Sequence, residues 1–366
     1  MKGKGKISTF QFFSILFVCR MIAFFTFIIT DRSEFSPENR SMLFLPYIVL
    51  GLLASVPALI IIGKKENGTV FDLTNRLSPK VTKLVSVIFA AAALWSAAVS
   101  ITRFDLFMST VMYPETELFA FILLMLAAAI LIAHSGLETA GRMSVIIIST
   151  IGVSLAFVVI TTVNHFKYTN LSPPLLNGVL PLIKSGFSSV TRTSELAALL
   201  VFAPKVNGSI KKGVAVWLLL LGIIISALFT LILGVTGEYG ERQMFQLYAL
   251  TVLSKIGVIE RLDALICAIW VLCSLTRLAF YLYTSELFFE GGFKIKSRTP
   301  VFIAFSFIIL AAYTCLSRSV TFFSKVLSFG INETVFTLII IILPIIILIA
   351  DRIKQRYNKS ASKSLI

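Results

Sequence analysis

Long apolar runs recur along the whole chain. Most of them approach the roughly 20 residues that a helix needs to cross the hydrocarbon core of a bilayer. The runs lie at about 8–30, 42–62, 84–102, 118–133, 143–163, 175–203, 214–236, 262–284, 300–317 and 334–350. The longest connections between them, about 63–83 and 237–261, are too short to bury a core of their own. The sequence therefore predicts an all-α integral membrane protein of about ten transmembrane helices, with residues 1–366 forming a single transmembrane domain.

The composition supports a membrane protein and gives no sign of an enzyme. Apolar residues make up 57% of the chain, and its 32 phenylalanines exceed what a soluble domain carries. The four cysteines fall inside apolar runs, and the two histidines have no second histidine or carboxylate at metal-ligand spacing. No Ser-His-Asp set and no phosphate-binding loop can be recognised. We expect no enzymatic activity, no metal and no cofactor.

Basic residues set the expected orientation. Of the 33 lysines and arginines, 20 lie on the side of the amino terminus, nine lie on the opposite side and four lie within the runs. The positive-inside rule places the richer side in the cytoplasm, together with both ends and a basic tail at 351–366. Anionic membrane lipids facing these connections account for the net charge of +15, so no nucleic acid is expected as a partner.

The ten runs divide into two halves of five, at about 8–163 and 175–350. Because each half has an odd number of helices, the second half enters the membrane from the opposite side, which is inverted-repeat topology. In such folds the first helix of each half is the interrupted one. Here the first and the sixth run, which hold these positions, both carry charge.

The sixth run contains the strongest functional signal. Residues 184–195 read Lys-Ser-Gly-Phe-Ser-Ser-Val-Thr-Arg-Thr-Ser-Glu, which places three charges and a glycine inside a membrane span. Charge at that depth is costly and marks ligand or ion sites. Small and hydroxylated residues between two apolar stretches are typical of a helix that is interrupted around a ligand. The candidate ligand-binding residues here are Ser185, Gly186, Phe187, Ser188, Arg192 and Glu195.

Arg20 provides a further intramembrane charge, in the first run. It lies about 12 residues into that run, or about 18 Å along a helix, and Glu195 lies nine residues before Pro204, or about 14 Å. These depths allow an ion pair between Arg20 and Glu195. The alternative is that Arg192, three residues before Glu195 and on the same helical face, neutralises Glu195 as a packed pair, while Lys184 extends outward to the interface.

Two segments resemble a known family. Residues 258–270 read Val-Ile-Glu-Arg-Leu-Asp-Ala-Leu-Ile-Cys-Ala-Ile-Trp and resemble the eighth span of spore germination permeases, the B subunits of nutrient germinant receptors. Residues 186–195, followed by Leu-Ala-Ala-Leu-Leu-Val-Phe-Ala-Pro, look like that family's sixth span, in which a carboxylate precedes an apolar run that ends in proline. The length, the ten predicted spans and the basic ends agree with the family over the whole chain.

The resemblance implies the amino acid, polyamine and organocation transporter superfamily and a LeuT-like fold with an interrupted sixth helix. It also implies a receptor subunit in the inner membrane of a dormant spore, which senses an amino acid or a similar small nutrient and signals germination. A larger A subunit and a lipoprotein C subunit would be its partners. Two alternatives stay open, a secondary amino acid or organic solute transporter coupled to protons or sodium, and a scaffold that has lost ligand binding.

One departure from the family concerns the first run. Members usually interrupt this span at a glycine, whereas residues 17–24 read Phe-Val-Cys-Arg-Met-Ile-Ala-Phe, with neither glycine nor proline. A continuous helix is therefore expected, with Arg20 in the pocket. Arg20 could hold the carboxylate of an amino acid through two parallel hydrogen bonds, or it could pair with Glu195 and plug the site.

The fold implied by the resemblance places the third and eighth spans beside the interrupted helices. The third span then offers Trp95 and Ser96 as ligand-lining residues, and the eighth offers Trp270 and Ser274. The alternative for both tryptophans is packing within the bundle, and for Ser274 it is a hydrogen bond to its own helix. Arg277 lies near the predicted cytoplasmic end of the eighth span, so its side chain is expected to reach the headgroups.

Overall fold

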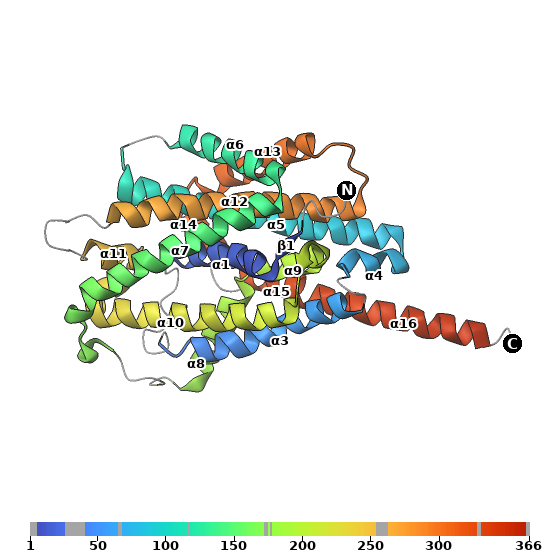
Figure 1. Ribbon diagram of the computed structural model, residues 1–366, viewed down its shortest axis with the longest axis horizontal. Coiled ribbons are helices and arrows are strands. Elements are labelled where there is room, and N and C mark those ends of the chain that lie inside the picture. The colour runs from blue at the N-terminus through green and yellow to red at the C-terminus, as the bar shows by residue number, and fades with distance from the viewer. Residues whose placement is uncertain are drawn as a thin grey trace.

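A computed structural model describes residues 6–25, 41–64, 68–115, 118–171, 175, 178–253, 263–327 and 331–363. Helices α3, α5, α10 and α12 run roughly along the long axis of the molecule (Figure 1). The elements in chain order are β1 (Ile7–Ser8), α1 (Thr9–Phe25), α3 (Phe44–Gly63), α4 (Val70–Leu77), α5 (Pro79–Phe107), η1 (Met108–Met112), α6 (Phe119–Ser135), α7 (Leu137–Thr162), η2 (Val163–His165), η3 (Tyr168–Asn170), α8 (Val179–Thr191), α9 (Glu195–Phe202), η4 (Ala203–Lys205), β2 (Val206–Asn207), α10 (Ile210–Arg242), α11 (Gln246–Val252), α12 (Asp263–Gly292), α13 (Arg298–Leu316), α14 (Val320–Leu327), α15 (Ile331–Thr337), η5 (Leu338–Ile342) and α16 (Leu343–Lys363).

The helices agree with the predicted runs. In the described part of the chain, seven helices are long and apolar enough to cross a membrane, and the first and fourth runs form shorter apolar helices. The sixth run forms two separate helices, α8 and α9. The prediction of an all-α integral membrane protein is therefore confirmed, whereas the relation between the halves 8–163 and 175–350 stays a prediction.

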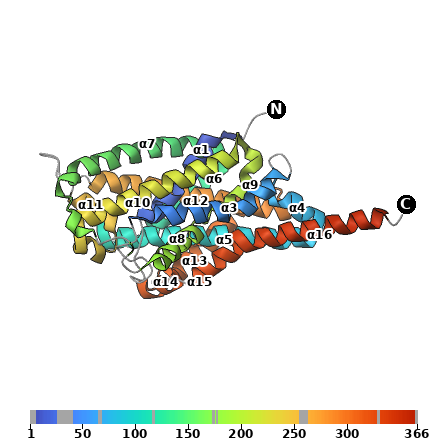
Figure 2. The ribbon, with the colours of Figure 1, turned by 90° about the horizontal axis from the view of Figure 1, so that it is seen from below.

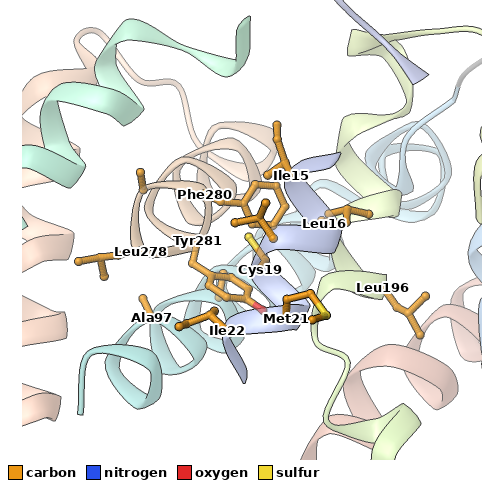
Figure 3. Close-up of a cluster of buried hydrophobic side chains, with 14 of the residues drawn as sticks. Ile15, Leu16, Cys19, Met21, Ile22, Ala97, Leu196, Leu278, Phe280 and Tyr281 are labelled. Atoms are coloured by element: carbon orange, nitrogen blue, oxygen red, sulfur yellow. The ribbon is translucent and has the colours of Figure 1, made fainter. Parts of the chain in front are cut away.

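Helix α1 lies inside the helical body. It contacts α7, α10 and α12, and most of its apolar side chains have no exposed surface. Figure 3 shows α1 within a cluster of buried side chains to which Ala97 of α5, Leu196 of α9 and Tyr281 of α12 also belong. Residues 17–24 lie within this one continuous helix, as the lack of glycine and proline predicted.

A short parallel pairing joins two distant segments. Ile7 pairs with Val206 and Ser8 pairs with Asn207, so the residues that precede α1 lie beside those that follow α9. The Thr9 hydroxyl donates a hydrogen bond to the Asn207 carbonyl oxygen at 2.9 Å. The start of α1 is thereby fixed next to the end of the interrupted sixth run.

The C-terminal segment continues the last helix. α16 crosses the predicted tail boundary at 351 and projects beyond the body of the molecule (Figures 1 and 2). Asp351 is 1% exposed and accepts a hydrogen bond at 2.6 Å from Nζ of Lys64, the residue that follows α3. Lys354 donates to two carbonyl oxygens at the end of α4, at 2.6 and 2.9 Å, where the helix dipole favours a cation. The first residues of the predicted tail are therefore bound to the protein.

Candidate functional site

The sixth run is interrupted as expected, but at a position without glycine. α8 ends at Thr191 and α9 begins at Glu195, so Arg192, Thr193 and Ser194 form the break. Main-chain hydrogen bonds that reach back only three residues replace the helical pattern here. The break therefore leaves a helix C-terminus and a helix N-terminus facing each other inside the membrane protein, with opposite partial charges.

Arg20 binds the C-terminal end of α8. From α1, its guanidinium donates to the carbonyl oxygens of Ser189 at 2.9 Å and Arg192 at 3.1 Å. Its Cζ also lies 6.0 Å from the ring centre of Tyr47 in α3. The last turn of a helix carries partial negative charge, which favours a cation there. Arg20 is 9% exposed, so carbonyl groups and an aromatic ring hold this buried charge.

Glu195 begins α9 and pairs with the eighth span. Its Oε1 lies 3.4 Å from Nη2 of Arg277 and accepts a hydrogen bond from the Tyr281 hydroxyl at 2.9 Å. The Tyr281 hydroxyl is also 2.6 Å from Ser194 Oγ. Glu195 is fully buried and Arg277 is 6% exposed. The N-terminus of α9, where a helix dipole favours negative charge, thus carries a carboxylate of the chain itself.

Arg277 connects this pair to α1. Its Nη1 donates to the Cys19 carbonyl oxygen at 2.6 Å, and Cys19 directly precedes Arg20. Figure 3 shows Cys19 of α1 beside Tyr281 of α12. Two consecutive residues of α1 therefore take part in one network. Arg20 bonds to the end of α8, and Cys19 is connected to the start of α9 through Arg277. A displacement of either half-helix would strain these contacts.

The structure corrects three expectations about these charges. Arg20 does not pair with Glu195, since Arg20 is bonded to main-chain carbonyl groups and the ion pair of Glu195 is with Arg277. For the same reason, Arg192 is not the residue that neutralises Glu195. Arg277 does not reach the headgroups, because α12 runs to Gly292 rather than ending near 284, which places Arg277 in the middle of the helix.

Gly186 belongs to the regular part of α8, six residues before the break. A Cβ at this position would lie 2.5 Å from Pro46 Cβ of α3, so glycine is needed here for close helix packing rather than for the interruption. Ser185 and Ser188 are buried in the same helix, and Phe187 is half-buried. Their predicted contact with a ligand stays a prediction.

The two candidates from the third span face different surroundings. Trp95 lines an apolar groove of about 310 Å³ together with Phe305 and Ile308 of α13. Ser96 instead lines an enclosed cavity beside the break, together with Ser194 and Tyr281. Of this pair, Ser96 is the residue that the structure places next to the break.

The enclosed cavity is small. Apart from a few hydroxyl groups, apolar side chains of α5, α9, α12 and the last span line it. It leaves about 10 Å³ for the centre of a water-sized sphere, which is room for about one water molecule. A solute of amino acid size therefore enters this space only if the surrounding helices move apart.

The candidates from the eighth span also differ. Trp270 stacks on Phe107 with 3.6 Å between ring centres and lies 6.0 Å from Phe245, so it belongs to an aromatic cluster. These contacts favour the packing interpretation of Trp270. Ser274 lies one helical turn before Arg277 and is 4% exposed, and its Oγ has no hydrogen-bond partner in the described structure.

Several buried polar atoms around the break make no hydrogen bond within the described structure. They are Arg20 Nε, Arg277 Nε, Glu195 Oε2 and Ser274 Oγ. All four residues are at least nine-tenths buried. An unsatisfied buried polar group costs roughly 1–3 kcal/mol, so polar groups of a ligand would be stabilised at this place.

Sequence reasoning missed Tyr281, Tyr47 and Arg103. Tyr281 follows Arg277 by four residues and therefore shares its helix face, which was the available signal. Arg103 lies one residue beyond the predicted third span, but α5 continues past it, and its charge interacts with those of the other arginines near the break. Tyr47 lies in an apolar run without any comparable signal.

The described residues include no group of three metal-ligating side chains. What the site can do is recognise charge, since it combines guanidinium groups, a carboxylate, hydroxyl groups and two helix ends in a buried space where electrostatic interactions are strong. The atoms that a ligand would bond belong to the same side chains that hold α1, α8, α9 and α12 together.

Comparison with known proteins gives two matches. The sequence model of a family described as spore germination protein matches residues 6–323, which include the break and every residue of the network. The protein named "Putative spore germination protein YfkT" from Bacillus subtilis (strain 168) is 24% identical over 245 residues. That alignment covers 64% of this chain and 67% of the relative.

Proposed function

Because this chain belongs to the spore germination protein family, we propose that it is the membrane subunit of a spore nutrient germinant receptor. In this role it senses an amino acid or a similar small nutrient and signals germination. The observation that carries the proposal is the break between α8 and α9, whose two ends are bonded to α1 and α12 by buried charged groups. A channel for bulk flow or a purely structural bundle would not need such a costly arrangement.

The network gives a physical route from binding to signal. A ligand that bonds to Arg20 or Glu195 competes with the contacts that hold the half-helices against α1 and α12. A ligand shifts a conformational equilibrium only through different affinities for its two states, and exchange of these bonds supplies that difference. Because β1 and β2 tie the start of α1 to the segment after α9, the two elements respond together.

The family supports a proposal for the setting of the receptor. We place the protein in the inner membrane of the spore, with both ends in the cytoplasm and two inverted repeats, 8–163 and 175–350, forming one transmembrane domain. The A subunit and the lipoprotein C subunit read its conformation. Basic residues of α16, such as Arg352 and Arg356, face anionic lipid headgroups.

A second candidate is a secondary transporter for an amino acid or organic solute. It is favoured by the hydroxyl chain that begins at Glu195, passes through Tyr281 and Ser194, and reaches the enclosed cavity. A buried carboxylate at the end of such a chain can carry a proton. Uptake of radiolabelled amino acids into vesicles that contain the protein tests this candidate.

The direct test of the receptor function is germination of spores that lack only this protein. A panel of amino acids and other nutrients is added, and release of spore contents is followed. We expect a selective loss of the response to one nutrient class, with normal responses to the others. Unchanged responses to every nutrient would contradict the receptor role and favour the transporter.

A further inference from the structure

The charged groups at the break do not balance. Among the described side chains, Arg20 and Arg277 carry two positive charges and Glu195 carries one negative charge. The nearby Arg103 and Arg192 add further positive charge. The end of α8 and the start of α9 add partial charges of about one half each, of opposite sign, which cancel. Glu195 is paired with Arg277, so the charge of Arg20 has no carboxylate partner among the described residues, where carbonyl groups and the Tyr47 ring hold it.

This excess is buried. Arg20 and Arg277 are 9% and 6% exposed, and Glu195 is not exposed at all. An uncompensated charge is strongly disfavoured out of water, so a negative charge brought into the site would be strongly stabilised. A zwitterion without net charge adds one charge of each sign and therefore does not neutralise the excess positive charge.

The unsatisfied atoms add hydrogen-bond requirements to the charge. Within the described part of the chain, Arg20 and Arg277 each keep an Nε–H without an acceptor, which suits the oxygens of a carboxylate. In the same part Glu195 Oε2 has no donor, and Ser274 Oγ can either donate or accept. A matching ligand therefore offers carboxylate oxygens to the arginines and an N–H or O–H to Glu195.

From this complementarity we infer that the nutrient recognised at the break is a small organic anion, with a net negative charge and at least one hydrogen-bond donor. Acidic amino acids meet both conditions. The inference rests on the proposed function for the word nutrient, but the charge preference concerns binding alone. Arg20 is the residue that sets this preference.

Binding to the purified full-length protein in phosphatidylcholine nanodiscs tests the inference, because this lipid adds no net charge. Calorimetric titration compares L-aspartate with L-asparagine and L-glutamate with L-glutamine, pairs of nearly equal shape that differ in charge. We expect at least one acid to bind about tenfold or more tightly than its amide. Succinate, which has the carboxylates without the ammonium group, should bind more weakly than aspartate.

Substitutions test whether Arg20 causes the preference for an acid over its amide. Arg20→Gln should reduce the ratio between acid and amide about tenfold, whereas Arg142→Gln, which removes a cation from an exposed pair with Glu138, should leave it unchanged. Arg20→Lys keeps the charge and should keep the direction of the preference. If Arg20→Gln does not fold, the comparison of acid and amide binding to the unaltered protein still tests whether the ligand is an anion.

Three outcomes overturn the inference. They are equal binding of acids and amides, binding of chloride as tight as that of aspartate, and no binding of any acid. The result is separable from the receptor role. If spores without the protein lose their response to a neutral nutrient, the receptor role is supported and the anionic ligand is rejected. If aspartate binds tightly but spores without the protein germinate normally, the anionic ligand is supported and the receptor role is rejected.

Discussion

The first and the sixth spans hold corresponding places in the predicted repeats, yet they place polar groups inside the protein in different ways. The first span, α1, is continuous and has a charged side chain, Arg20, at its buried position. The sixth is split into α8 and α9, and the main chain from Arg192 to Ser194 lies outside the regular helical hydrogen-bond pattern. The guanidinium of the continuous helix bonds to the carbonyl groups of the interrupted one.

This difference shows where the specificity of the site comes from. A break in both spans would leave two sets of main-chain groups for a ligand to bind. In this chain one set is replaced by a side chain with a full positive charge, which also occupies the end of α8. In the receptor that we propose, side-chain charge therefore decides what binds, and the break of the sixth span supplies the hydrogen-bond partners of that charge.

The largest effect is expected from the carboxylate at the start of α9. Glu195→Gln leaves Arg277 buried without its anion, and loss of one partner of a buried pair costs about 3–5 kcal/mol. We expect a large drop in the thermal unfolding midpoint and in nutrient-triggered germination. Glu138→Gln is the matched control, because Glu138 pairs with Arg142 on the exposed surface. Equal losses in both variants would contradict the assignment.

A smaller effect is expected when the continuous span loses its charge. Arg20→Ala removes two hydrogen bonds to carbonyl groups, but Thr193 Oγ1 still donates to Ser189 O at 2.9 Å, so one of the two acceptors keeps a partner. Bonds from a charged donor contribute about 1.5–3 kcal/mol. Chemical unfolding of the purified protein measures the loss, which should be less than that of Glu195→Gln.

A double-mutant cycle sharpens this prediction. Arg277→Ala and Glu195→Ala should couple by roughly 0.5–3 kcal/mol, whereas Arg20→Ala and Glu195→Ala should be nearly additive. If Arg20 and Glu195 couple as strongly as Arg277 and Glu195, then Arg20 pairs with Glu195, as the sequence suggested.

The next effect concerns packing rather than charge. Gly186→Ala places a Cβ 2.5 Å from Pro46 Cβ, and overpacking of this kind costs about 1–3 kcal/mol. Gly152→Ala is the control, because a Cβ there meets nothing within 4 Å. The unfolding midpoint should fall for the first and stay level or rise for the second. An undisturbed Gly186→Ala protein would show that α8 is not held tightly against α3.

How much of this site the sequence predicted depends on helix boundaries. The apolar runs and the charges placed the break within 184–195, and Glu195 was identified from its depth. Its partner was missed because the eighth span was ended near 284, eight residues before α12 ends, which moved Arg277 towards the surface. Polar residues in the last turns of α12, such as Glu286, hide its true length from a search for apolar runs.

Helix rotation was the second unknown. Trp95 and Ser96 were predicted to line one site, but neighbouring residues of a helix differ in direction by about 100°. Only the packed structure shows which of them faces the break. Gly186 poses a related difficulty, since a glycine that permits close packing and a glycine that interrupts a helix look alike in sequence.

The smallest effect is expected at Trp95. Because it lines a groove with α13, Trp95→Phe should change the nutrient concentration for half-maximal germination by no more than about twofold, in line with changes of about 0.5 kcal/mol away from a site. Ser96→Ala is the companion variant on the cavity side. A loss of response confined to Trp95→Phe would mean that the groove, rather than the break, holds the ligand.

The central claim is that the nutrient binds at the break, against Arg20. The most direct measurement is the nutrient dose-response of spores that carry Arg20→Lys, which keeps the charge but loses the planar two-donor geometry. We predict a rise of about tenfold in the half-maximal concentration of the nutrient whose response depends on this protein, with the maximal rate and the protein level unchanged. An unchanged dose-response at a normal protein level would contradict it.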